Sequence, residues 1–316
     1  MTSYVLNRVL SILPTLLGAS LLVFAMSRFV PGSVVEQMIG AEATISQEAR
    51  QRLLQYFGLN DPIPIQYAKW LRDVVQGDLG TSWRTGISVA TIMFERLGVT
   101  LLLTAGALFV ALAVGIPLGL LSAVRENTWI DHVVRVLSLF SLSIPIFWQA
   151  AMLILGLSLW LDWTPPMRYV GPGTDLRANV TIMFLPSIVL GTVVSANIMR
   201  MTRSVLLDVL RHDYVRTARS KGVRERGVLW VHALKNAMIP VVTVIGLQVG
   251  YLLGGSVITE EVFNLPGLGR LLLGAVNQRD LPLVQGCILL ISFMFVVTNL
   301  LVDLIYATLD PRIEYA

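Results

Sequence analysis

Residues 100–124 read TLLLTAGALFVALAVGIPLGLLSAV, a run of 25 residues without a charged side chain. An α-helix rises about 1.5 Å per residue, so a helix of this length crosses the roughly 30 Å of hydrocarbon in a bilayer. The run therefore predicts a membrane-spanning helix. Five further apolar runs of suitable length cover residues 9–26, 133–160, 182–199, 238–258 and 283–306.

The composition of the whole chain agrees with a membrane protein. Of its 316 residues, 55% are hydrophobic and 14% are charged, whereas a soluble domain carries about 25% charged residues. We therefore expect an all-α polytopic membrane protein with six transmembrane helices. Residues 1–95 are expected to form an N-terminal anchor helix and an extracytoplasmic segment, and residues 96–316 a core with the other five spans.

The distribution of basic residues predicts the orientation in the membrane, because cytoplasmic loops carry an excess of lysine and arginine. With the N-terminus inside, the inner segments hold twelve Lys and Arg side chains, and the two short outer loops hold four. Both termini are therefore expected in the cytoplasm. The first run also has features of a cleavable signal peptide, but its length favours an uncleaved anchor.

The long outer segment after the first span contains two helix signals. The first is an amphipathic pattern formed by Ala49, Leu53, Leu54 and Phe57. The second covers residues 65–75 and places Tyr67, Trp70 and Leu71 on one face. Such a segment either caps the membrane surface or belongs to a docking face, and the pattern favours neither.

The motifs of several catalytic classes are absent from the sequence. A phosphate-binding GxxxxGK[ST] loop is excluded, because the lysines at 69, 221 and 235 follow Ala, Ser and Leu. Neither HExxH nor GxSxG occurs, and the three histidines are far apart. We therefore expect no catalytic residues, no metal site and no cofactor in this chain. Few ionisable residues lie within the spans, which disfavours an ion-coupled transporter.

Most of the positive charge lies in one internal loop. Between Thr202 and Lys235 there are eight Lys and Arg residues and three acidic residues. Residues 204–220 have the spacing of an amphipathic helix, and Gly222 is placed to end it. A second helix is expected over residues 224–237, leading into the fifth span. A basic charge is ordinary for an inner loop, but the amphipathic order suggests a short projecting element that docks on another protein.

This loop, DYVRTARSKGVRERGVLWVHALKNAMIP at residues 213–240, resembles the EAA loop of binding-protein-dependent ABC importer permeases. In that family, an Ala and a Gly four residues later mark the coupling helix that docks on the ATPase subunit. The matching positions are Ala218 and Gly222. Arg216 and Thr217 replace the usual Glu-Ala pair, a departure that is ordinary in the peptide and nickel branch.

Other stretches resemble the dipeptide/oligopeptide permease family, and more narrowly its B-type subunit. They are SLSIPIFWQ (141–149), GLNDPIPIQYAKWL (58–71), GDLGTSW (77–83), EEVFNLPGLGRLL (260–272) and LDPRIEY (309–315). The resemblance covers nearly the whole chain in order. It implies the fold of a type I ABC importer permease in the bacterial inner membrane.

The resemblance also implies the partners and the power source. This non-catalytic subunit would pair with a homologous C-type permease, two cytoplasmic ATPases that hold ATP and Mg, and an extracytoplasmic solute-binding protein. The substrate would be a dipeptide or oligopeptide, while nickel chelates, glutathione or another small solute remain alternatives. The residues expected to couple to the ATPases are Asp213, Ala218, Arg219, Lys221, Gly222 and Arg224.

Polar residues supply candidates for two further sites. Candidates for the translocation path lie within the spans and are Ser141, Ser143, Gln149, Asn197, Gln248 and Asn299. Each is also explained by hydrogen bonding between helices. Candidates for docking the binding protein lie in the outer segments and are Asp61, Trp83, Glu260, Glu261 and Arg270. The alternative for residues 266–269 is a turn that packs the outer ends of helices.

Overall fold

The computed structural model describes residues 2–29, 48, 51–52 and 60–309. The amphipathic pattern at residues 49–57 and most of the motif at residues 309–315 lie outside this part. Among the described residues the regular structure is helical, apart from an isolated bridge between Thr81 and Ser88. The helices are α1 (Thr2–Phe29), α4 (Ile63–Val75), α5 (Val89–Val124), α6 (Trp129–Ser143), α7 (Ile146–Leu161), α8 (Leu176–Leu210), α9 (Asp213–Ser220), α10 (Glu225–Gly227), the π-helix η1 (Val228–Ala233), α11 (Leu234–Gly255), α12 (Val257–Val262), α13 (Leu268–Asn277) and α14 (Leu281–Leu309).

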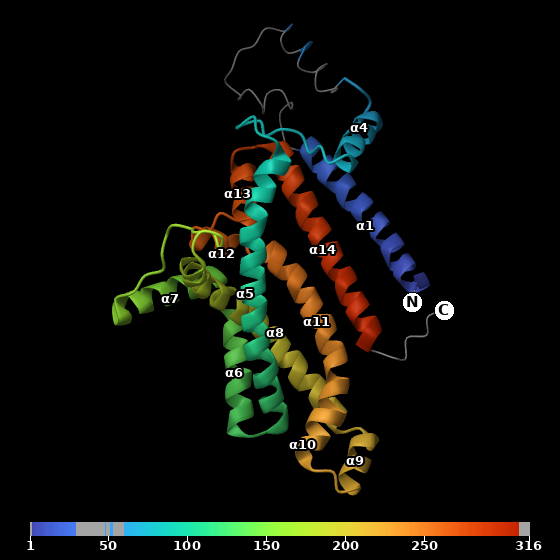
Figure 1. The fold of residues 1–316 in the computed structure, drawn as a ribbon, viewed down its shortest axis with the longest axis vertical. Helices are drawn as coiled ribbons and strands as arrows, with labels where there is room; N and C mark the ends of the chain where they lie inside the picture. The colour runs from blue at the N-terminus through green and yellow to red at the C-terminus, as the bar shows by residue number, and fades with distance from the viewer. Residues whose placement is uncertain (1, 30–47, 49–50, 53–59, 310–316) are drawn as a thin grey trace.

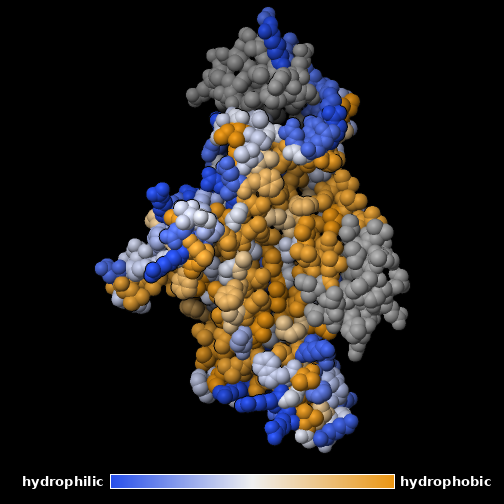
Figure 2. Space-filling model, viewed as in Figure 1, coloured by the Kyte–Doolittle hydropathy of each residue, from blue (hydrophilic) through white to orange (hydrophobic). Residues whose placement is uncertain are grey.

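The long helices form an elongated bundle with different elements at its two ends (Figure 1). Helices α9 and α10 lie at one end, which we call the α9 end, and α4 and α13 lie near the other, which we call the α4 end. Hydrophobic residues gather over the middle of the molecule, and hydrophilic residues gather at both ends (Figure 2). This distribution fits a bundle that crosses a membrane with its two ends in water.

Among the described residues, four helices are long and apolar enough to cross a membrane: Val89–Val124, Leu176–Leu210, Glu225–Gly254 and Leu281–Leu304. The run at residues 133–160 is not one straight helix, because α6 and α7 meet at a bend of 107°. Pro145 lies at the bend and Ile144 before it is extended, as proline's preceding residue usually is. The described residues thus contain four spans, or five with the bent pair counted as one, so the number of six is not confirmed.

Helices α5 and α8 form the most extensive helix pair, and small residues bring them together. A Cβ atom added at Gly191 of α8 would lie 2.6 Å from the carbonyl oxygen of Ala107. One added at Gly115 of α5 would lie 2.8 Å from the carbonyl oxygen of Ser195. Close backbone contact of this kind is a usual basis of helix association in membranes.

A buried ion pair joins α6 to α8 at the α9 end. The side chain of Asp131 is fully buried, and Arg203 binds both of its oxygens. The hydroxyl of Ser122 in α5 also donates to Asp131, as does the backbone N–H of Asn127 at 3.1 Å. Three helices are therefore connected through one carboxylate.

Helix α4 packs against α1, in agreement with the helix predicted over residues 65–75. The hydroxyl groups of Ser20 and Tyr67 lie 2.8 Å apart. The ring of Phe24 contacts Tyr67 and Trp70 at centroid distances of 5.4 and 5.6 Å. The aromatic face of α4 is thus used within the chain, which favours the cap over the docking face.

Candidate functional site

The predicted coupling element at the α9 end differs from one continuous helix over residues 204–220. Helix α8 ends at Leu210, His212 is extended at φ −67° and ψ 147°, and α9 begins at Asp213. The carboxylate of Asp213 lies in the first turn of α9, where the helix dipole favours negative charge. The prediction of one helix is wrong, and the break lets the apolar faces of α8 and α9 join one buried cluster.

Gly222 ends α9 as predicted. Its φ of +77° lies in the left-handed region that favours glycine. Its N–H donates to the carbonyl of Arg219 at 2.9 Å, and the N–H of Val223 donates to that of Ala218 at 3.2 Å. These two bonds form a Schellman motif, which satisfies the last carbonyls of the helix.

Ala218 lies on the inner face of α9, where only 8% of its surface is exposed. It belongs to a cluster that also contains Leu206, Val209, Val215, Val228, Ala233 and Ala237. The small side chain therefore allows α9 to approach its own chain, and a direct contact of Ala218 with another protein is not expected in this arrangement. The exposed side chains of α9 and its C-terminal turn are Asp213, Tyr214, Arg216, Thr217, Arg219, Ser220 and Lys221.

The charged residues around the turn at Gly222 fall into two groups. Arg219 pairs with Glu225 at 2.9 Å and so connects α9 to α10. Lys221 and Arg224 are exposed, and neither forms an ion pair with another described residue. These two cations are free to interact with an acidic surface.

The helix predicted over residues 224–237 is confirmed, with one irregular segment. Residues 225–254 form a single run that leads into the membrane, but η1 within it has π-helical hydrogen bonding. The backbone N–H of Leu234 donates to the carbonyl of Leu229, five residues earlier. The hydroxyl of Tyr214 in α9 lies 3.3 Å from the carbonyl oxygen of His232 in this segment.

The candidate path residues at the bend between α6 and α7 form a hydrogen-bonded group. Gln149 donates to the carbonyl oxygens of Ser141 and Ile144 at 2.9 and 3.0 Å. Ser141 donates to the carbonyl of Thr192 in α8 at 3.1 Å. These contacts satisfy polar groups at the bend, as expected if these residues form hydrogen bonds between helices. Thr192 was not singled out from the sequence, because a lone threonine in an apolar run carries no pattern.

The other candidate path residues are spread over separate helices. Ser143 is exposed and donates to the carbonyl of Leu139 at 2.9 Å in its own helix. Asn197 in α8 accepts a hydrogen bond from Arg200 at 3.0 Å. Gln248 in α11 and Asn299 in α14 are half-buried. The structure therefore brings together Ser141 and Gln149 but not the rest of the set.

Glu260, a candidate docking residue, lies inside the protein at the α4 end. Its side chain is fully buried. One carboxylate oxygen accepts hydrogen bonds from Thr100 at 2.7 Å and Ser256 at 3.0 Å. The other accepts the backbone N–H of Arg270 at 2.9 Å, in the first turn of α13. Glu260 thus connects α12 and α13 to α5, and a direct contact with a second protein is not expected for a carboxylate buried in this way.

Glu261 and Arg270 remain on the surface, where Arg270 Nε lies 3.2 Å from the carboxylate of Glu261. Asp61 is held by Lys69 at 2.7 Å at the start of α4. The backbone N–H of Trp83 donates to the buried side chain of Asp280 at 3.2 Å. The docking candidates therefore lie on separate elements, of which the loop of Trp83 and α13 face each other.

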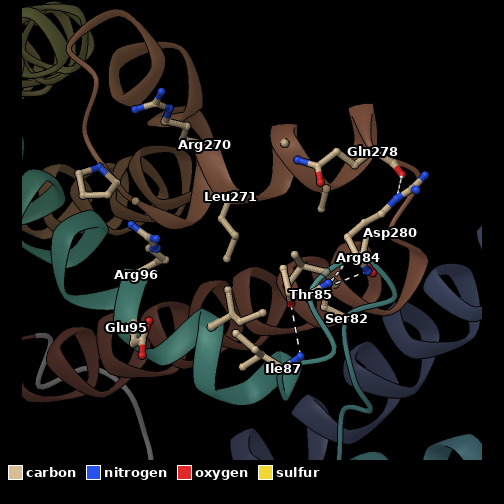
Figure 3. A pocket seen from close by; sticks show the side chains of 16 residues that line it. Ser82, Arg84, Thr85, Ile87, Glu95, Arg96, Arg270, Leu271, Gln278 and Asp280 are labelled. Atoms are coloured by element: carbon tan, nitrogen blue, oxygen red, sulfur yellow. Dashed lines mark hydrogen bonds between the residues drawn. The ribbon is translucent and has the colours of Figure 1, made fainter.

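The loop of residues 79–88, the start of α5 and α13 enclose a pocket of about 520 Å³ at the α4 end. Arg84, Arg96 and Arg270 line it from these three elements (Figure 3). The Nε of Arg84 donates to the carbonyl of Gln278 at 3.0 Å. Arg96 is half-buried and makes no hydrogen bond or ion pair with another described residue. Arg84 and Arg96 were missed from the sequence, because isolated arginines in an outer segment form no motif.

Two family models match this chain. Residues 115–315 match the family described as "Binding-protein-dependent transport system inner membrane component". Residues 1–104 match "Binding-prot-dependent transport system membrane comp, N-term". A solved structure titled "Crystal structure of an amino acid ABC transporter with histidines" overlaps weakly, with 18% identity and a TM-score of 0.48 over 71% of this chain and 94% of that chain.

Two curated relatives match this chain along essentially their whole lengths. The "Dipeptide transport system permease protein DppB" of Escherichia coli (strain K12) is 43% identical over 100% of this chain and 99% of that protein. The "Oligopeptide transport system permease protein AppB" of Bacillus subtilis (strain 168) is 41% identical over the full length of both. The chain therefore belongs to the family of binding-protein-dependent transport system inner membrane components, within the branch of the dipeptide and oligopeptide ABC permeases.

Proposed function

We propose that this chain is the channel-forming subunit of an ATP-driven peptide importer, and that α9 is the element through which separate ATPase subunits drive it. The observation that supports the proposal is the way in which α9 is packed, capped and exposed. Its inner face packs on its own chain, its C-terminus is fixed by Gly222, and its exposed face is polar. A short helix of this kind offers a partner a rigid, shaped surface.

In this proposal the α9 end faces the cytoplasm and the α4 end faces outward. The excess of basic residues between Arg200 and Lys235 supports this orientation. Helix α1 begins and α14 ends toward the α9 end (Figure 1), so both termini would lie on the cytoplasmic side of the inner membrane.

The proposed partners are a C-type permease, two ATPases that bind ATP and Mg, and a solute-binding protein outside. The peptide substrate rests on the names of the relatives, which are a dipeptide and an oligopeptide permease. Ligand binding by the partner solute-binding protein would separate peptides from nickel chelates or glutathione, because the selected ligand would be retained on that protein.

The substitution Gly222→Val tests the role of α9. Valine at a φ of +77° is strained by roughly 1–2 kcal/mol, so the turn should distort. We expect the folded membrane protein to persist while ATPase association or substrate-stimulated ATP hydrolysis is lost. Gly173→Val is the matched control, because that glycine has no positive φ and open space around it. Unchanged ATPase association and transport in Gly222→Val would contradict the proposal.

We further propose that the pocket at the α4 end contacts the solute-binding protein. Arg96 is the cation there without a partner among the described residues, so it is available to an acidic side chain. Arg96→Glu should weaken binding of the solute-binding protein, whereas Arg177→Glu, another outer arginine, should not. Equal binding to both variants would rule out this contact.

A further inference from the structure

The segment between α9 and α11 contains an uncommon structure, the π-helix η1 (Val228–Ala233). π-Helical turns make up well under 1% of residues in globular proteins and often occur at functional sites. One extra residue per turn shifts the register of the helix, so the residues before and after η1 project from different faces than in a regular α-helix. Any connection between α9 and this segment therefore acts where the helix departs from regular geometry.

Tyr214 makes such a connection. Its hydroxyl donates to the carbonyl oxygen of His232 at 3.3 Å and accepts from the side-chain amide of Asn236 at 2.9 Å. The same amide donates to the carbonyl of His232 at 3.1 Å. These three hydrogen bonds are mutually compatible, because a phenol hydroxyl can donate one hydrogen bond while it accepts another, and a side-chain amide NH₂ can donate two. The ring of Tyr214 also stacks on His212, with 5.9 Å between centroids.

The other contacts of α9 with the body of the protein are of a different kind. Val215 and Ala218 are buried by apolar packing, which has no directional preference. Arg219 pairs with Glu225 within the loop itself. Hydrogen bonds depend on both distance and angle, so the group of Tyr214, His232 and Asn236 fixes the orientation of α9 relative to the start of α11.

We propose that Tyr214 is a positioning residue that transmits displacement of α9 to α11 through His232 and Asn236. This inference rests on the proposed docking of ATPase subunits on α9. A force on the exposed face of α9 reaches α11 through these directional bonds, at the π-helical segment where the helix can change register. Loss of the hydroxyl leaves α9 docked but loosely oriented.

The position of Tyr214 separates this role from a purely structural one. Tyr214 is 43% exposed, so it adds little to the core, and Tyr214→Phe keeps the ring and its stacking on His212. Tyr251→Phe is a matched control on α11, because Tyr251 is 47% exposed and makes no hydrogen bond with another described residue. Both variants lose one exposed hydroxyl, and only one loses the connection.

The experiment uses the full transporter, assembled with its ATPases and solute-binding protein in lipid vesicles. We expect Tyr214→Phe to keep ATPase co-purification and the unfolding temperature of the wild type. The ratio of substrate-stimulated to basal ATP hydrolysis should fall about threefold, because the variant loses both hydrogen bonds of this exposed hydroxyl. Tyr251→Phe should leave that ratio unchanged.

A second variant tests whether the residues act together. Asn236→Ala should lower the same ratio, and the double variant Tyr214→Phe/Asn236→Ala should fall no further than the more affected single variant. A wild-type ratio in Tyr214→Phe overturns the inference, and so does a loss of ATPase association or of unfolding temperature specific to that variant. Failure of the unaltered chain to bind ATPases would instead overturn the proposed function, so the two failures are distinguishable.

Discussion

Arg203 binds the buried carboxylate of Asp131 through two nitrogens, with Nε 2.7 Å from Oδ1 and Nη2 2.8 Å from Oδ2. Arg203 lies in the part of α8 that leads to α9, and Asp131 lies in the first turn of α6. The pair therefore fixes the base from which the proposed coupling element projects. It also joins the first turn of α6 to α8.

Removal of one member of this pair should destabilise the fold strongly. Arg203→Ala leaves the carboxylate of Asp131 buried without its cation, which costs about 3–5 kcal/mol. The unfolding temperature of the purified protein in detergent measures the loss. Arg211→Ala is the control, because Arg211 pairs with Glu126 at the surface and such pairs contribute about 1 kcal/mol or less. Equal unfolding temperatures for the two variants would contradict this role of Asp131.

The contact between α5 and α8 predicts opposite effects for two Gly→Ala substitutions. A Cβ at Gly191 would lie 2.6 Å from backbone, so Gly191→Ala should destabilise by about 1–3 kcal/mol. Gly98 lies in α5 with nothing within 4 Å of an added Cβ, so Gly98→Ala should stabilise by up to about 1 kcal/mol through helix propensity. Thermal unfolding in detergent checks both signs. A stabilised Gly191→Ala protein would show that α5 and α8 are not in this close contact.

The cations at the turn of Gly222 predict a salt-dependent interaction with the ATPase subunits. Lys221 and Arg224 are exposed and have no ionic partner among the described residues. The double reversal Lys221→Glu/Arg224→Glu should weaken ATPase association by about tenfold at low salt, and by less at high salt, where charges are screened. Arg279→Glu, at the α4 end, serves as the control. If ATPase association is the same in the charge-reversed variant and at both salt concentrations, these cations do not face the ATPase.

Local signals in the sequence were sufficient for part of this site. A glycine that follows an amphipathic run commonly ends a helix, and Gly222 does so through a Schellman motif. Long apolar runs likewise predicted most of the spanning helices. Both signals act within one element and need no knowledge of the tertiary structure.

Features that depend on contacts between distant segments could not be predicted in this way. Asp131 and Arg203 lie on different helices, and neither stands in a motif that indicates the other. Ala218 matched a family position, but its inward direction follows from the break at His212. Pro145 was a visible signal, yet a proline in an apolar run is compatible with either a kink or a sharp bend.

The neighbouring carboxylates of Glu260 and Glu261 predict different phenotypes for the same chemical change. Glu260 is fully buried, and its two carboxylate oxygens accept three hydrogen bonds. In Glu260→Gln an amide nitrogen replaces one of these oxygens. Because this nitrogen cannot accept a hydrogen bond, for example from the backbone N–H of Arg270, at least one of the three bonds is lost. We expect a loss of about 1–3 kcal/mol in stability, since a buried donor or acceptor is left unsatisfied. Glu261→Gln removes only a surface pair with Arg270 and should cost about 1 kcal/mol or less.

A second measurement on the same two variants separates stability from docking. If the surface formed by Glu261 of α12 and Arg270 of α13 contacts the solute-binding protein, Glu261→Gln should change the affinity for that protein without lowering the unfolding temperature. Glu260→Gln should lower the unfolding temperature, and a wild-type value would mean that the carboxylate is not held by Thr100, Ser256 and the first turn of α13. The two variants thus test Glu260 as part of the packing of α12 and α13 against α5, and Glu261 as part of an outer surface. Their effects should differ because the Glu260 side chain is buried and the Glu261 side chain is exposed, although the two residues are adjacent.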